Sequence, residues 1–172
     1  MDTMNARGAA QERLRCAFAC SRCAMHIYEH LRPGDNRLCA ALDIIADYLA
    51  ALPGGVAAGS DLVAAMWEAE QAMAGAADES PVALATASVV LLCRAVLGHV
   101  EGEALADIEI EAFQACWYAA KATNTVLDEG EGQPTIPTTI VTRHDIQALA
   151  QAFLLWQDYW HDHEPRLPGK DG

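Results

Sequence analysis

CAFACSRCAMHIYEHLRPGDNRLCAAL, residues 16–42, predicts two helices joined by a single turn and sets the fold class. On both sides of the turn, apolar side chains recur every three or four residues, which is the spacing of a helix face that packs against a core. Pro33 and Gly34 stop the first helix, and Asp35 or Asn36 can cap the second. The stretch therefore predicts closely packed helices.

The polar residues around this turn have a structural interpretation. Arg37 directly follows Asp35 and Asn36, and Glu29 lies in the last turn of the preceding helix. The Arg37 guanidinium can pair with Glu29 or with Asp35. We expect this ion pair to lock the turn rather than to bind a ligand.

The remaining chain predicts an all-α bundle of about six helices. At 172 residues it suggests one domain, 1–172, and with 52% hydrophobic but only 6% aromatic residues its core must consist mainly of alanine, leucine and valine. Residues 82–97, VALATASVVLLCRAVL, are apolar on nearly every side, so this helix is expected at the centre of the bundle. The expected helices cover approximately residues 5 or 11 to 31, 36–51, 60–75, 81–97, 103–127 and 142–161.

Three segments are expected outside the helical bundle. Residues 128–141 form a long acidic loop that contains two prolines, and residues 1–10 and 164–172 are expected to be flexible.

The first fifteen residues lack the apolar run of a signal peptide, and no stretch reaches the roughly 18 uncharged apolar residues of a membrane span. These features predict a soluble cytoplasmic protein whose six cysteines are reduced.

The cysteines admit two interpretations. Cys20 and Cys23 form a CxxC motif with Cys16 nearby, a pattern that can bind zinc or copper. However, the motif lies inside an amphipathic helix rather than on a turn, His26 lies about 120° around the helix from Cys20, and Cys93 and Cys116 stand alone in the sequence. We therefore expect the cysteines to pack as small apolar groups, with no metal and no cofactor.

The charge of the chain is concentrated in its middle. Of a net charge of −13, residues 43–131 hold fifteen acidic and two basic side chains. Such a field repels nucleic acid and anionic membranes and attracts basic protein surfaces; the alternative is a solvated face that only keeps the protein soluble. Glu103, Asp107 and Glu111 recur at steps of four on one expected helix face. Further acidic residues extend this candidate binding surface at the helix ends: Glu101, Asp128, Glu129 and Glu131.

Catalytic motifs are missing from the sequence. It contains no GxSxG, no glycine-rich phosphate loop and no HExxH. The acidic steps of four lack the Glu-x-x-His partners that a di-iron helical bundle requires. We therefore expect that the protein is not an enzyme.

Two stretches resemble the immunity proteins that are encoded beside bacterial toxins. CAMHIYEHLRPGDNRLCAAL is similar to the opening helix, turn and second helix of that family, although Leu38 stands where the family usually has proline. GHVEGEALADIEIEAFQACWYAAKA is similar to its glycine–histidine joint and closing helix. The matching residues are Cys23, Ala24, Tyr28, Glu29, Pro33, Asp35, Asn36, Arg37, Gly98, His99, Tyr118, Ala119, Lys121 and Ala122.

The resemblance implies a non-catalytic inhibitor that neutralises a cognate toxin, here by laying an acidic face on a basic one. A second hypothesis is a phage-encoded inhibitor of the anti-CRISPR type, which would mimic the charge of nucleic acid. A third, from another class, is a small metal-binding or redox bundle that uses Cys16, Cys20 and Cys23.

Overall fold

The computed structural model is an all-α bundle, and it describes residues 3–52, 59–128 and 140–157. Its helices are α1 (Thr3–Leu31), α2 (Arg37–Ala51), α3 (Gly59–Gln71), α4 (Pro81–Glu101), α5 (Leu105–Asp128) and α6 (Arg143–Leu155). The described residues contain no strand. The predicted all-α class and helix number are thereby confirmed.

Helix α4 lies at the centre of the bundle, as its composition predicts. The Ser80 hydroxyl caps its first turn by accepting a hydrogen bond from the Ala83 amide at 3.2 Å, and Pro81 occupies the first helical position. By length and hydropathy α4 could cross a membrane, but 67% of its most apolar window is buried against other helices. Its apolar character is therefore that of a core helix.

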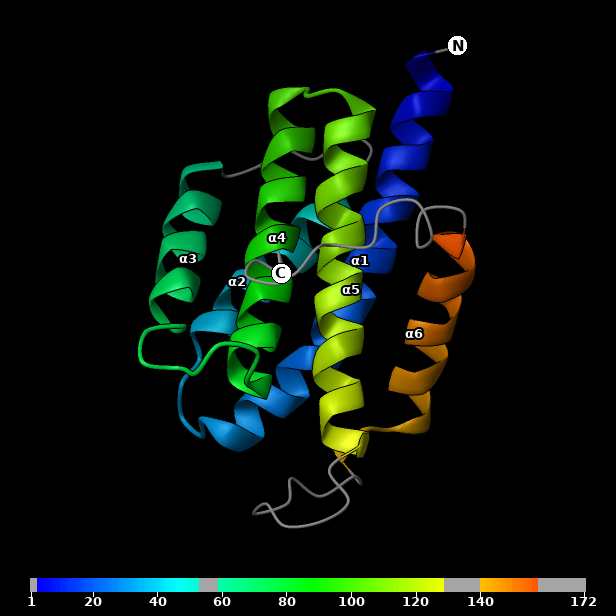
Figure 1. Ribbon diagram of the computed structural model, residues 1–172. Helices are drawn as coiled ribbons and strands as arrows, with labels where there is room; N and C mark the ends of the chain where they lie inside the picture. Colours follow the sequence, from blue (N-terminus) through cyan, green and yellow to red (C-terminus); the bar gives the residue numbers. More distant parts are fainter. Residues whose placement is uncertain (1–2, 53–58, 129–139, 158–172) are drawn as a thin grey trace, which may run out of the picture.

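The other helices are arranged around a layer formed by α1, α4 and α5 (Figure 1). Helices α4 and α5 run side by side in opposite directions and pack along their lengths, while α1 contacts both. Helices α2 and α3 cover one side of α4, and α6 packs mainly against α1. This arrangement places the α4–α5 corner at one end of the bundle.

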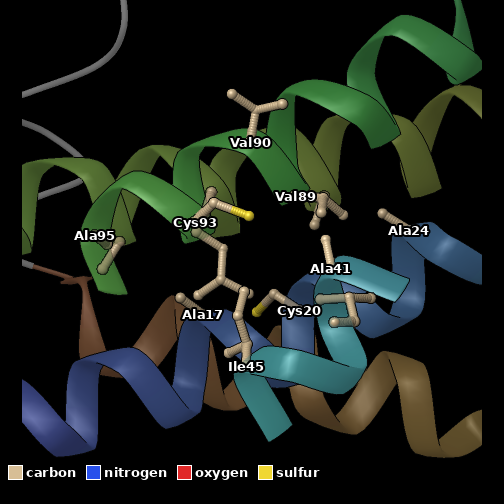
Figure 2. Close-up of a cluster of buried hydrophobic side chains, with 14 of the residues drawn as sticks. Ala17, Cys20, Ala24, Ala41, Ile45, Val89, Val90, Cys93 and Ala95 are labelled. Carbon is tan, nitrogen blue, oxygen red and sulfur yellow. The ribbon is translucent and has the colours of Figure 1, made fainter. Parts of the chain in front are cut away.

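Small side chains allow these helices to approach closely (Figure 2). Ala17, Cys20 and Ala24 of α1 extend into the same cluster as Ala41 of α2 and Val89 of α4. Each of these five residues has no exposed surface. Dense packing of this kind supplies the core that aromatic residues supply in other proteins.

A hydrogen-bonded pair of serines links the three inner helices within this core. The Ser88 hydroxyl on α4 donates to the Ala115 carbonyl on α5 at 2.8 Å, and the hydroxyls of Ser21 on α1 and Ser88 are 2.9 Å apart. Both serines are fully buried. Each buried hydroxyl therefore has a partner, as a folded interior requires.

Two helix ends differ from their expected positions. Helix α1 begins at Thr3, so residues 3–10, which we expected to be flexible, are helical, and Ala10 is buried against the bundle. Helix α6 begins with the predicted capping box of Thr142 and Asp145 but ends at Leu155 rather than near residue 161. The expected flexible tail at 164–172 and most of the 128–141 loop lie outside the described residues.

Candidate functional site

The acidic residues predicted to bind a partner gather at the corner between α4 and α5. Glu101 is the last residue of α4, Glu103 lies in the joint, and Asp107 and Glu111 occupy the first two turns of α5. We call these four residues the acidic ridge. Glu101, Glu103 and Asp107 are exposed and Glu111 is partly buried.

The position of Glu103 corrects the sequence prediction, which placed it inside the fifth helix. Gly102 adopts a left-handed conformation, with φ of 76°, that ends α4. The Glu103 amide then donates to the Gly98 carbonyl at 2.9 Å, which is the bond of a Schellman cap. The turn folds Glu103 back over α4, where a Cβ atom at Gly98 would lie 2.5 Å from its carboxylate oxygen. The ridge is therefore built from a capping turn and a helix, not from one helix face.

The carboxylates of the ridge lie close enough to act on one another. Burial raises the pKa of the Glu111 carboxyl, and the neighbouring charges of Glu103 and Asp107 raise it further, while Arg94 acts in the opposite direction. Glu109, between these residues in sequence, faces α1 instead and pairs with Arg13 at 3.5 Å. The ridge thus holds a concentrated negative charge that Arg94 offsets only in part.

Of the remaining predicted acidic residues, Asp128 does not extend this surface. Asp128 ends α5 about 25 Å along the helix from Glu111, at a rise of 1.5 Å per residue. Because this length of helix separates the two residues, Asp128 does not belong to the acidic ridge. Glu129 and Glu131 lie outside the described residues.

A groove beside the ridge was not anticipated from the sequence. It has a volume of about 640 Å³ and lies between the first turns of α1 and the α4–α5 corner, with Arg7, Tyr48, His99, Glu103 and Ile108 in its lining. The Tyr48 hydroxyl is 2.6 Å from Nδ1 of His99. Burial lowers the pKa of His99 and raises that of Tyr48, which favours a neutral pair in which the hydroxyl donates to the imidazole.

The turn between α1 and α2 is held as predicted, with Asp35 as the partner of Arg37. The Asp35 carboxylate accepts hydrogen bonds from Nη2 of Arg37 at 2.6 Å and from the Tyr28 hydroxyl at 2.6 Å. The Arg37 guanidinium holds the pKa of Asp35 well below its usual range. Glu29 is exposed, and Asn36 occupies the N-cap position without a side-chain cap bond. These contacts join neighbouring helices, which is a structural role.

The cysteines are grouped differently from the alternative metal-site hypothesis, which joined Cys16, Cys20 and Cys23. Cys116, which stands alone in the sequence, lies with Cys16 and Cys20, and the three sulfur atoms are within 4.8 Å of one another. Cys23 belongs to another contact, because its thiol donates to the carbonyls of Ala19 and of Asp145 on α6. The CxxC motif is therefore divided, and Cys116 is a candidate site residue that the sequence did not reveal.

Comparison of the chain with protein-family models, with curated proteins and with solved structures gives no match.

Proposed function

We propose that this protein is a non-catalytic inhibitor that binds the basic surface of a partner protein, most directly a cognate bacterial toxin in the cytoplasm, through its acidic ridge. The single observation behind the proposal is the gathering of the ridge carboxylates at one exposed corner of the bundle, where the charges of Glu103 and Asp107 add to burial in raising the pKa of Glu111. A cationic partner would relieve this repulsion. Solubility alone requires no such concentration of charge.

The surroundings of the ridge support binding rather than chemistry. Glu101, Glu103 and Asp107 are exposed, so a partner can reach them without unfolding the bundle. The adjoining groove offers Leu105 and Ile108 as apolar lining beside these charges. A basic side chain with an apolar stem, such as lysine or arginine, would lie with its stem on this lining and its charge at the exposed Glu103 carboxylate, on the ridge side of a groove that Arg7 also lines. The resemblance to immunity proteins supports a toxin as that partner.

The test compares two triple charge reversals of equal size. The ridge variant carries Glu101→Lys, Glu103→Lys and Asp107→Lys, all at exposed positions. The control variant reverses three exposed acidic residues on α2, on α3 and in the turn before α4, away from the corner: Asp43→Lys, Glu68→Lys and Asp78→Lys. Both variants change the net charge identically, so they separate a local contact from a general electrostatic effect.

Each protein is used to capture partners from a lysate of the host, and the captured protein is then produced for kinetic measurements. We expect the ridge variant to lower the association rate at least about tenfold at low salt, and the control to lower it much less. Rising salt should slow association of the wild type. Equal losses of association rate in the two variants, or no loss in either, would show that the ridge is only a solvated surface. The identity of the captured protein separates a toxin from a nucleic-acid-processing enzyme.

A further inference from the structure

Three thiols converge where α1 packs against α5. Cys16 and Cys20 are one turn apart on α1, and Cys116 faces them from α5, with all sulfur–sulfur distances within 4.8 Å. All three cysteines are free thiols. We call them the thiol trio. It lies apart from the acidic ridge and has no part in the proposed function.

The sulfur spacing fits one shared metal ion. A metal–sulfur bond of about 2.3 Å, the length found in zinc thiolates, places three sulfurs about 4 Å apart around a trigonal ion. From separations of at most 4.8 Å, each pair would close by no more than about 0.8 Å. A disulfide would instead bring one pair to about 2 Å and leave the third thiol without a role. The smaller movement favours a metal.

The donor set then selects the ion. Thiolates are soft ligands that favour Cu(I) over hard cations such as Mg²⁺ or Ca²⁺. Structural zinc sites in proteins are almost always completed to four ligands, whereas Cu(I) accepts three thiolates in a plane. Within the part of the chain that the structure describes, no further histidine, cysteine or carboxylate ligand atom joins the trio. We propose that Cys16, Cys20 and Cys116 form a three-thiolate binding site for Cu(I).

The trio has an entry path on one side and a dry interior on the other. Cys16 is partly exposed and lines a groove of about 580 Å³ between α1 and α6, together with Arg15, Gln151 and Leu155. Cys20 and Cys116 are buried, with 0% and 1% exposure. An ion would first meet the accessible thiol and then be enclosed by the other two. This arrangement protects Cu(I) from water and from oxidants.

The charge of the bound state also has a partner. Binding releases the three thiol protons to solvent, so one Cu(I) and three thiolates carry a charge of −2. Arg13, one helical turn before Cys16, forms an ion pair with Glu109 at 3.5 Å, and its buried Nε and Nη1 make no hydrogen bond among the described residues. The guanidinium is therefore placed to compensate thiolate charge.

Titration with Cu(I) tests the proposal on the full chain without a histidine tag. The reduced protein competes anaerobically with bicinchoninate, a chromogenic Cu(I) chelator, and the loss of chelate absorbance counts the bound ion. We expect the wild type to bind one equivalent of Cu(I), and Cys16→Ser and Cys116→Ser to bind it at least about 100-fold more weakly. Such a loss of affinity exceeds the loss that follows when a ligand only loses a hydrogen-bond partner. Cys23→Ser, a buried thiol on the same helix, is the matched control and should bind like the wild type.

Several results would overturn the site. These are a wild type that holds no Cu(I) against the chelator, a Cys23→Ser loss as large as that of Cys16→Ser, or retention of Zn(II) but not Cu(I). Air-dependent formation of a Cys16–Cys116 disulfide in a protein that does not bind Cu(I) would assign the trio to redox chemistry instead. Circular dichroism of each variant monitors folding; if Cys116→Ser does not fold, the partly exposed Cys16→Ser decides the question.

Discussion

Replacing Ser88 with alanine should destabilise the bundle more than the loss of a single hydroxyl suggests. Ser88 has one hydroxyl proton, which it donates to the Ala115 carbonyl at 2.8 Å. The Ser21 hydroxyl must therefore be the donor in the 2.9 Å contact between the two serines. Ser88→Ala removes the acceptor of Ser21 and leaves only the backbone carbonyl of residue 88, at 3.5 Å.

The size of the effect follows from burial. Both serines are 0% exposed, so no water replaces the lost partner. An unsatisfied buried polar group costs about 1–3 kcal/mol, and we expect a loss of unfolding free energy in this range for Ser88→Ala. Ser21→Ala leaves the bond from Ser88 to Ala115 intact and should cost about 0.5–1.5 kcal/mol. The double variant leaves no unpaired hydroxyl, so it should cost less than the sum of the single variants.

Urea denaturation of the four proteins in this cycle measures these differences. The dependence on denaturant should be unchanged, because no variant alters the surface exposed on unfolding. Ser60→Ala, an exposed serine at the start of α3, is the control and should change stability by less than about 0.5 kcal/mol. Additive effects of the two core substitutions would refute the argument, because they would show that the two hydroxyls do not depend on each other.

Three further substitutions test other contacts. Tyr28→Phe removes the 2.6 Å hydrogen bond to Asp35 and should lower the unfolding free energy by about 1–2 kcal/mol in denaturant melts; no change would show that Arg37 alone holds the turn. Asp145→Ala removes the acceptor that the capping box of α6 requires. Burial raises the pKa of the Asp145 carboxyl, but hydrogen bonds with Thr142 outweigh burial and lower it. The contribution of this carboxylate to stability is therefore present above about pH 3.9 and is lost as pH falls through the folded pKa. Hydrogen exchange of α6 should therefore accelerate in the variant at pH 7, and an unchanged rate would contradict this role. Gly98→Ala should stabilise the protein by up to about 1 kcal/mol in thermal melts, because alanine favours a helix over glycine and the added Cβ displaces only the carboxylate tip of Glu103. A loss of stability would show that the Glu103 carboxylate is held in place.

Local signals in the sequence sufficed for the N-terminal caps of α4 and α6. Ser80 and Pro81 start α4, and Thr142 and Asp145 form the capping box of α6 as predicted. Each cap is formed by residues that are close in sequence, so it can be predicted without knowledge of the fold. The start of α1 was placed too late, and the burial of Ala10 depends on helices that are distant in sequence.

The acidic ridge was predictable in composition but not in shape. A step of four residues placed Glu103 on the same helix face as Asp107, but glycine at 102 ends α4 and the turn holds Glu103 outside α5. The bond from Glu103 to the Gly98 carbonyl belongs to the cap of the preceding helix. Periodicity alone cannot distinguish a residue in a first helical turn from one that closes the previous helix.

The thiol trio depends on a quantity that the sequence does not contain. At 100° per residue, Cys16, Cys20 and Cys23 all lie within about 60° on α1, so the angle around the helix does not separate them. Their positions along the helix axis do separate them. Cys16 lies about 6 Å from Cys20 toward the N-terminus of α1, and Cys23 lies about 4.5 Å from Cys20 toward its C-terminus. Cys116 meets α1 at the level of Cys16 and Cys20, whereas the backbone of α6 occupies the level of Cys23. The CxxC spacing draws attention to Cys20 and Cys23, but the register of α5 against α1 brings Cys116 to Cys16 and Cys20. That register is set by the packing of small side chains between two helices that are almost a hundred residues apart in sequence.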